Sequence, residues 1–309
     1  MENQDQFDVA VIGGSYAGLS AAMALGRSLR KTLIIDSGMP CNRQTPHSHN
    51  FITQDGEPPH RIAQKARAQV LEYPTVTFTE GKVTEVSREN NGFRVALSEG
   101  SAYSVRKVLF ATGIRDLMPD LSGFEECWGI SLIHCPYCHG YEVRHKKTGI
   151  LANGERAFEF CTFIRNWTDD LTLFTNGEAL LSAEQKALLH EMGIPVVEKE
   201  ITGLTHQQGT LKHIDFTDGS TAELCALYYH AGFEQHCKIP EALGCAMTEQ
   251  GHIEVDFFGK TSVPGIFAAG DNTTPMRTVS VAVAAGTKAG AFINRELIDE
   301  GLKALQDSL

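Results

Sequence analysis

The sequence predicts an α/β fold in which one nucleotide-binding unit occurs twice. Residues 7–36 and residues 148–174 each show a buried strand, a turn of small residues, a helix and a second buried strand. A Cys-x-x-Cys pair, Cys135 and Cys138, lies shortly before the second unit. A chain of 309 residues is long enough for two domains, each with a core of its own.

The first unit has the order of elements that a dinucleotide requires. Residues 7–12 are an apolar strand, residues 13–18 are a glycine-rich turn that opens an Ala- and Leu-rich helix, and the strand at 32–35 ends at Asp36. A pyrophosphate binds the free N–H groups at such a helix N-terminus, and an acidic residue about 20 positions further on binds the ribose. Ser15 replaces the middle glycine, which makes the closest backbone approach slightly less favourable.

The region after the first unit contains a loop and several short elements. The polar loop at 37–50 has a length that is common for loops contacting a ligand. We expect a helix at 62–71 and a buried strand at 108–113 that ends in a turn of small residues. Between them, alternating apolar residues predict a meander of three strands, at 75–79, 82–87 and 93–97.

The second half repeats the nucleotide-binding pattern. Residues 116–123 are predicted to be a crossing between domains, and the second unit has its turn at 152–157 and its second strand at 171–174. A strand at 263–271 then precedes an Ala- and Val-rich helix at 279–297. Glycines in that helix allow close packing, either within the chain or against a second copy.

The Cys135–Cys138 pair predicts redox chemistry. Two thiols at this spacing close a small disulfide ring, and a titratable neighbour, His139, follows them. The alternative is zinc, but a structural zinc site needs four ligands and the other cysteines are scattered singly. Two core cysteines without chemistry are the third interpretation, which the polar residues after the pair disfavour.

Composition excludes several classes of function. The net charge of −11 disfavours nucleic acid and anionic membranes as partners. No apolar run approaches the roughly 18 residues of a membrane helix, and the polar N-terminus lacks the features of a signal peptide. Eight cysteines without an export signal indicate a reducing compartment, so we expect a cytoplasmic protein.

Four segments together resemble the low-molecular-weight thioredoxin reductase family over nearly the whole chain. They are the turn at 13–18, Ala111-Thr112-Gly113, the Cys135–Cys138 pair and the segment 261–271. This resemblance implies two Rossmann-like domains of three-layer ββα type. An FAD-binding domain, residues 1–117 and 246–309, would be split by an inserted pyridine-nucleotide-type domain, residues 118–245, which carries the cysteines. It also implies a homodimer.

The same resemblance implies which residues bind FAD. Asp36 would lie near the adenosine ribose, Asp271 near the ribityl chain or pyrophosphate, Asn50 on the flavin side, and Thr278 and Val279 near the flavin ring. The full implied set follows the chain: Gly13, Ser15, Tyr16, Ala17, Gly18, Asp36, Ser37, Asn42, Arg43, Asn50, Val83, Ala111, Thr112, Gly113, Gly270, Asp271, Thr278 and Val279. No metal ligand is implied.

The second unit departs from the family where a nicotinamide nucleotide would bind. The first glycine of its turn is replaced by Ala152, and Glu155 would place like charge against a pyrophosphate. The residues after the strand at 171–174 contain no Arg or Lys to bind a 2′-phosphate, although Arg156 and Arg165 offer partial compensation. We therefore expect NADPH binding to have been lost.

The cysteine pair departs from the family as well. Thioredoxin reductases usually have Asp after the second cysteine, whereas here His139 occupies that position. The run from Cys135 to Glu142 resembles the FAD-dependent dithiol oxidases that close disulfides in gliotoxin and holomycin. A histidine with an ordinary pKa near 6.5 accepts a thiol proton near neutral pH. A helix cap or a surface residue is the alternative interpretation of His139, and packing or solvation is that of His134 and Glu142.

These observations predict an FAD-dependent thiol–disulfide oxidoreductase. The resemblance implies that Cys135 exchanges with the substrate and that Cys138 faces the flavin. With no nicotinamide site, O2 is the simplest electron acceptor, so the predicted direction is dithiol to disulfide. The sequence does not distinguish between a small dithiol, a peptide and a thioredoxin-like protein as the substrate. Three alternatives remain: an NADPH-dependent thioredoxin reductase, a reductase fed by ferredoxin or another flavoprotein, and a flavin-binding redox sensor without turnover.

Overall fold

The computed structural model describes residues 6–309, which form two compact units. The first unit contains residues 6–43, 60–115 and 234–309, and the second contains residues 44–59 and 116–233. The expected domain limits had placed 44–59 and 116–117 with the first part and 234–245 with the second. Residues 1–5, part of the polar segment that argued against an export signal, lie outside the described residues.

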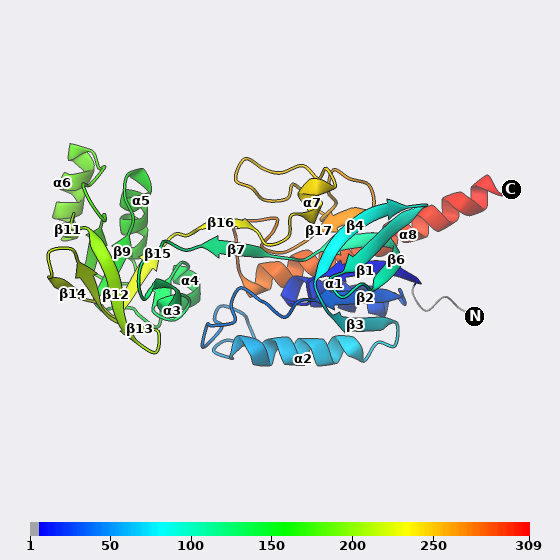
Figure 1. Ribbon diagram of the computed structural model, residues 1–309, viewed down its shortest axis with the longest axis horizontal. Helices are drawn as coiled ribbons and strands as arrows, with labels where there is room; N and C mark the ends of the chain where they lie inside the picture. Colours follow the sequence, from blue (N-terminus) through cyan, green and yellow to red (C-terminus); the bar gives the residue numbers. More distant parts are fainter. Residues whose placement is uncertain (1–5) are drawn as a thin grey trace. The chain divides into compact units, whose positions relative to one another are not determined.

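A seven-stranded sheet forms the centre of the first unit (Figure 1). Its strands follow the order β3-β2-β1-β6-β5-β4, and β17 also pairs with β6. The bounds are β1 Gln6–Ile12, β2 Thr32–Asp36, β3 Val76–Glu80, β4 Val83–Glu89, β5 Gly92–Leu97, β6 Ala102–Phe110 and β17 Ile266–Ala268. The predicted three-strand meander is wrong in one strand, because β3 runs parallel to β2 and only β4, β5 and β6 pair antiparallel.

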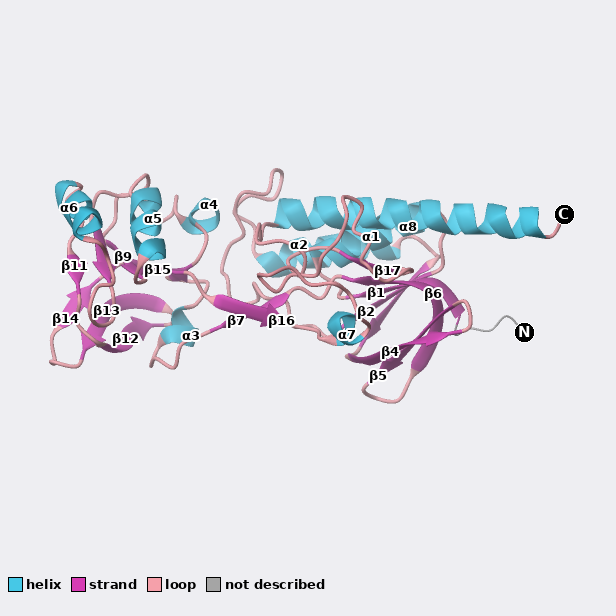
Figure 2. Ribbon diagram, turned by 90° about the horizontal axis from the view of Figure 1, so that it is seen from above, coloured by secondary structure: helices cyan, strands magenta, loops and turns pink. Residues whose placement is uncertain are grey.

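The helices of the first unit pack against this sheet and against each other (Figure 2). They are α1 Tyr16–Arg27, α2 Pro59–Leu71, the single turn α7 Ile239–Ala242 and α8 Val279–Asp307. A Cβ atom at Gly286 would lie 2.0 Å from the carbonyl oxygen of Ala17, and one at Gly290 would lie 2.5 Å from that of Ala21. The glycines of α8 therefore serve close packing on α1 within the chain.

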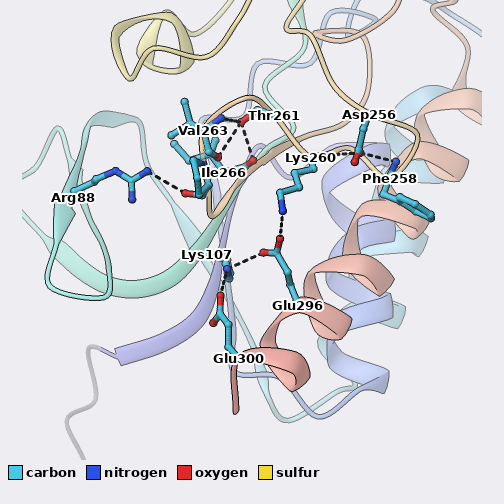
Figure 3. Close-up of polar contacts among 11 residues, drawn as sticks. Arg88, Lys107, Asp256, Phe258, Lys260, Thr261, Val263, Ile266, Glu296 and Glu300 are labelled. Carbon is cyan, nitrogen blue, oxygen red and sulfur yellow. Dashed lines mark hydrogen bonds and ion pairs between the residues drawn. The ribbon is translucent and has the colours of Figure 1, made fainter. Parts of the chain in front are cut away.

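Charged residues join β6 to α8 in the first unit (Figure 3). The side chain of Lys107 on β6 is only 7% exposed, and its Nζ donates to Glu296 Oε2 at 2.8 Å and also to Glu300. Lys260 donates to the other oxygen of Glu296. Burial alone would raise the pKa of Glu296, but the two ammonium groups outweigh it and lower that pKa. Few charges are buried without partners, and here each has one.

The second unit has three layers. A parallel five-stranded sheet in the order β11-β10-β9-β15-β8 has an antiparallel three-stranded sheet, β12-β13-β14, on one face and helices on the other. The strand bounds are β8 Leu132–Ile133, β9 Thr148–Leu151, β10 Leu171–Phe174, β11 Val196–Val197, β12 Ile201–Gln207, β13 Thr210–Phe216, β14 Thr221–Glu223 and β15 Ala226–Tyr229. The helix bounds are α3 Phe124–Cys127, α4 Pro136–His139, α5 Glu155–Ile164 and α6 Ala183–Glu191. The predicted α/β class is confirmed.

Two of the passages of the chain between the units, those at 115–116 and 233–234, run through short strands. They are β7 Ile114–Leu117 and β16 Gly232–Gln235, which pair with each other. None of the helices within residues 6–309 has the length and hydropathy needed to cross a membrane.

Candidate active site

The glycine turn after β1 is packed so tightly that side chains are excluded. A Cβ atom at Gly13 would lie 2.2 Å from the carbonyl oxygen of Ala111, and one at Gly18 would lie 1.8 Å from that of Gly13. Gly13 also has φ +107°, a backbone conformation that favours glycine. A Cβ atom at Gly14 would meet the side chain of Asp36 at 2.8 Å, so the end of β2 lies directly beside the turn.

Parallel strands bring three separated segments to one edge of this sheet. Because β1, β6 and β17 are parallel neighbours, their carboxyl ends place the turn at Gly13, the segment at Thr112 and the turn at Gly270 together. Ala111 N–H donates to Ile12 at 2.8 Å, and a Cβ atom at Gly270 would lie 3.0 Å from the Cβ of Ala17. Ligands of open α/β sheets bind at such an edge.

Two features of this edge fit a dinucleotide. Ser15 is the N-cap of α1, but its side chain makes no capping hydrogen bond, so the N–H groups of the first turn are not satisfied by that side chain. The hydroxyl of Thr112 is buried and has no hydrogen-bond partner among the described residues. A buried hydroxyl of this kind is costly unless a ligand or water pairs with it.

The remaining expected cofactor residues occupy several positions. Asn42 donates to the Tyr16 hydroxyl at 3.5 Å beside the turn, and burial raises the pKa of Tyr16. Arg43 donates to the backbone of Pro40. The hydroxyl of Thr278 caps α8 by accepting from Val281 at 3.2 Å.

Three expected cofactor residues have surroundings that the sequence did not predict. Asp271 follows β17 and lies 3.8 Å from the guanidinium of Arg277. Val83 packs within the hydrophobic core of the first unit. Asn50 belongs to the second unit, where its N–H donates to Asp55 at 2.7 Å.

In the second unit, Cys135 and Cys138 form a disulfide across the single turn α4, with Cα atoms 5.3 Å apart. Pro136 occupies the first turn, where its missing N–H costs nothing. A Cβ atom at Gly140 would lie 2.5 Å from the Pro136 carbonyl oxygen and 2.9 Å from the Tyr228 hydroxyl, so glycine is required for this packing. The spacing of the pair thus gives a closed disulfide in a fixed turn.

His139 is the last residue of α4 and is half-buried. Burial first, and the neighbouring imidazole of His49 second, lower the pKa of His139, while Glu142 acts in the opposite direction. An imidazole with a lowered pKa is neutral near neutral pH and is free to accept a proton. His134 instead stacks on Trp128, with ring centroids 5.8 Å apart, as its packing interpretation expects.

The turn of the second nucleotide-type unit is filled by the side chain of Asn153. Its Oδ1 accepts from the N–H groups of Gly154 and Leu180, both at 2.8 Å. Its Nδ2 donates to the carbonyl oxygens of Thr175 and Glu178, at 3.2 and 2.9 Å. One side chain therefore ties the turn before α5 to the loop after β10.

The charge at the start of α5 is also held in place by the protein. Glu155 is the first residue of the helix, and its carboxylate accepts from Gln185 of α6 at 2.7 Å. The sequence predicted the charge of Glu155 but not the role of Asn153. Within residues 6–309 no group of three or more His, Cys, Asp or Glu side chains is arranged to hold a metal ion.

The histidine pair in the second unit was also missed by sequence reasoning. His49 lies near the end of the polar loop at 37–50, in the segment 44–59 that belongs to the second unit, and its ring lies edge-on to that of His139 with centroids 6.3 Å apart. Glu142 Oε1 lies 3.6 Å from His49 Nε2. The only available signal was the presence of two histidines, His47 and His49, in a loop of unusual length.

Comparison with known proteins agrees with these features. The pyridine nucleotide-disulphide oxidoreductase family matches residues 7–286. Thioredoxin reductase sirT of Leptosphaeria maculans is 30% identical over 315 residues, which cover 96% of each chain. The crystal structure of a putative thioredoxin reductase TrxB from Bacillus anthracis is 32% identical with a TM-score of 0.91, covering 95% of this chain and 99% of that one. The crystal structure of HlmI is 33% identical with a TM-score of 0.93, covering 100% and 98%.

These findings confirm the resemblance that the motifs predicted. FAD is the cofactor of this family. The glycine turn at Gly13, the uncapped start of α1 and the orphaned hydroxyl of Thr112 suit such a dinucleotide. The chain therefore belongs to the pyridine nucleotide-disulphide oxidoreductase family, as a thioredoxin reductase-like, FAD-dependent disulfide oxidoreductase.

Proposed function

We propose that the enzyme oxidises a dithiol to a disulfide through Cys135 and Cys138, with O2 as final acceptor and without NADPH. The observation that carries the proposal is the filled second turn. Asn153 Oδ1 accepts from the N–H groups of Gly154 and Leu180, and the N–H of Gly154 at the start of α5 is one that a pyrophosphate would need. Its Nδ2 is held by the carbonyl oxygens of Thr175 and Glu178. Glu155 adds like charge at the same helix N-terminus.

The steps at the cysteine pair follow from thiol–disulfide exchange. A substrate thiolate attacks Sγ of Cys135, which forms a mixed disulfide and releases Cys138 as a thiolate. The second substrate thiol loses its proton and attacks the substrate sulfur of the mixed disulfide. The substrate then leaves as a disulfide and Cys135 as a thiolate. Two electrons have moved to the pair, and two protons have left the substrate.

We assign to His139 the role of accepting these protons. Its lowered pKa keeps the imidazole neutral, so that a ring nitrogen accepts the proton of a substrate thiol. Raising the thiolate fraction of the substrate accelerates both attacks, because the thiolate is the nucleophile. His139 thus acts as general base during oxidation of the substrate.

FAD, when bound, supplies the two-electron acceptor for the cysteine pair and passes the electrons to O2. The net reaction is dithiol plus O2 to disulfide plus hydrogen peroxide. We assign its binding to the first unit, with Gly13, Gly18 and Thr112 lining the pyrophosphate region and Asp36 on the ribose. The other residues of the first unit implied by the family resemblance complete this assignment, apart from Val83, whose side chain packs in the hydrophobic core; Asn50 belongs to the second unit. The proposal extends to a cytoplasmic homodimer.

The substrate of the proposed reaction is a small dithiol or a thioredoxin-like protein. Relatives named thioredoxin reductase, such as sirT, support a protein disulfide partner and, with it, an NADPH-driven reductase as the second candidate. The filled turn at Asn153 favours the oxidase.

Anaerobic mixing with NADPH separates the two candidates. We expect the flavin absorbance to persist with NADPH and to bleach with a dithiol such as dithiothreitol. In air, the same dithiol should give oxygen uptake matched by hydrogen peroxide. Rapid bleaching by NADPH would refute the oxidase proposal and establish the reductase. Bleaching by neither would indicate a flavin-binding protein without turnover or one that needs another electron donor.

A further inference from the structure

We propose that Tyr228 is a positioning residue of the redox turn, residues 135–140. Its buried hydroxyl has no hydrogen-bond partner while Cys135 and Cys138 are joined, and it gains one, the carbonyl oxygen of Pro136, when the disulfide opens. Tyr228 therefore favours the reduced pair and makes the disulfide a stronger electron acceptor. This inference deepens the proposed function and rests on it, because it concerns the disulfide that would take electrons from the substrate.

Tyr228 is a fully buried residue with an unsatisfied polar group. It lies on β15 with 0% of its surface exposed, and its hydroxyl has no hydrogen-bond partner among the described residues. Protein atoms cover the hydroxyl oxygen, which leaves no space for a water beside it. A buried hydroxyl without a partner raises the free energy of the state that contains it. The protein with a closed disulfide therefore holds a donor that any state supplying an acceptor would relieve.

The side chain of Tyr228 is held in place and stays neutral. The ring of Phe160 on α5 packs edge-on against it, with centroids 5.7 Å apart at 80°. Burial first, and the carboxylate of Glu142 second, raise the pKa of Tyr228, so the hydroxyl keeps its proton. Because the ring is packed, a change in its pairing must come from movement of the partner.

The redox turn lies directly against this hydroxyl. A Cβ atom at Gly140 would lie 2.9 Å from the Tyr228 hydroxyl and 2.5 Å from the carbonyl oxygen of Pro136, so both oxygens flank the same point. That carbonyl already accepts the N–H of Gly140 at 2.7 Å, but a carbonyl oxygen has a second lone pair. A small shift of the turn therefore joins the hydroxyl of Tyr228 to the free lone pair of Pro136.

Opening the disulfide supplies that shift. Cys135 is the N-cap of α4 and Cys138 is its third residue, so the disulfide closes a ring around the backbone of Pro136. Two sulfurs that are no longer bonded must move apart, because non-bonded atoms keep their van der Waals separation. The backbone between them then gains a freedom that the closed ring denies it. The new hydrogen bond stabilises the open turn and relieves the orphaned hydroxyl.

The test measures the reduction equilibrium of the cysteine pair in the flavin-loaded enzyme without oxygen. The protein is equilibrated in glutathione or dithiothreitol buffers of graded ratio, its thiols are alkylated, and mass spectrometry gives the reduced fraction of Cys135 and Cys138. Tyr228→Phe removes the hydroxyl and keeps the ring. We expect the equilibrium constant for reduction to fall about 10-fold, since one hydrogen bond is lost from the reduced state and one orphaned group from the oxidised state. This corresponds to a potential lower by about 30 mV.

Tyr229 offers a matched control on the same strand. It follows Tyr228 in β15, so its side chain points to the opposite face of the sheet, where its ring packs edge-on against Phe124 with centroids 5.0 Å apart. Tyr229→Phe removes a hydroxyl from the face away from Tyr228. We expect its reduction equilibrium to match that of the wild type.

The inference is overturned if Tyr228→Phe leaves the equilibrium constant unchanged or raises it, or if Tyr229→Phe lowers it equally. A merely structural role of the hydroxyl would affect both redox states alike and leave the constant unchanged. The measurement needs neither turnover nor oxygen. An unchanged constant with normal oxygen uptake therefore refutes this inference alone, whereas the expected shift without oxygen uptake refutes the proposed function alone.

Discussion

Replacing Asn153 by alanine tests the feature on which the proposed function rests. The change removes two accepted and two donated hydrogen bonds between the second turn and the loop after β10. Two of these bonds are partly buried and two are exposed. At about 1 kcal/mol for each partly buried bond and about half that for each exposed one, the second unit should lose roughly 3 kcal/mol.

Hydrogen exchange measures this loss locally, which matters because a chain of two units need not unfold in one step. About 3 kcal/mol corresponds to roughly 100-fold faster exchange of amides that the second unit protects. The N–H groups of Gly154 and Leu180 should lose their protection first. Asn166→Ala changes an exposed asparagine of the same unit, and we expect its effect to stay within about 0.5 kcal/mol.

The same variant also tests why NADPH is not expected to bind. Glu155 keeps its charge at the start of α5 and no cation is added, so Asn153→Ala should still fail to bleach with NADPH. Exchange rates equal to those of wild type would refute the view that Asn153 holds the turn closed. Rapid bleaching of the variant would refute the contribution assigned to Glu155.

Four further predictions concern the cysteines, the proposed base His139, the glycine turn at 13–18 and the ion pairs of Lys107. Cys138→Ser should abolish dithiol oxidation, because no disulfide is left to accept the substrate's electrons. When a linear disulfide such as oxidised glutathione is added, its Cys135 thiolate should attack one sulfur, keep that half as a mixed disulfide that mass spectrometry detects, and release the other half as a thiolate. Cys225→Ser, which changes an exposed cysteine, should retain full activity. Because the pKa of His139 is lowered, the acid limb of kcat/KM should lie below about pH 6.5, and His139→Gln should lower the rate at neutral pH by about 10²-fold or more; an unchanged rate would exclude it as base. Gly18→Ala should purify without flavin absorbance, because its Cβ would lie 1.8 Å from the carbonyl oxygen of Gly13. Normal flavin content would contradict the assignment of FAD binding to this glycine turn. Lys107→Met removes the buried cation of the cluster, but Glu296 keeps Lys260 and Glu300 keeps Arg106. The free energy of unfolding should fall by about 1–2 kcal/mol, between the values for an exposed and a fully buried pair. A denaturant midpoint equal to wild type would show that Lys107 contributes nothing.

Local patterns explain how much of the fold could be predicted. The strand at Leu171–Phe174 agrees with its prediction to the residue, since four apolar or β-branched residues between polar ones leave little choice. The strand predicted at 75–79 is also present, but the prediction paired it with the wrong neighbouring strand. Alternation of side chains reports only which face is buried, whereas pairing β3 with β2 depends on a helix folding back over the sheet. The final helix extends beyond the predicted Leu297 to Asp307. Ile298, Leu302 and Leu305 continue its apolar spacing, although their side chains are exposed.

The sequence by itself determined the chemistry of this protein. The turn at Gly13, the Cys135–Cys138 pair and His139 identify a flavoprotein thiol–disulfide site, because each motif is made of neighbours in the chain. Only the tertiary structure decided which residues from distant parts of the chain contact these motifs. Asn153 closes the second turn through backbone groups more than 20 residues away. His49 precedes strands β3 to β6 in the chain and His139 follows them, yet their rings lie edge-on to each other. Such contacts depend on which loops the sheets bring together, and no local pattern of residues encodes them.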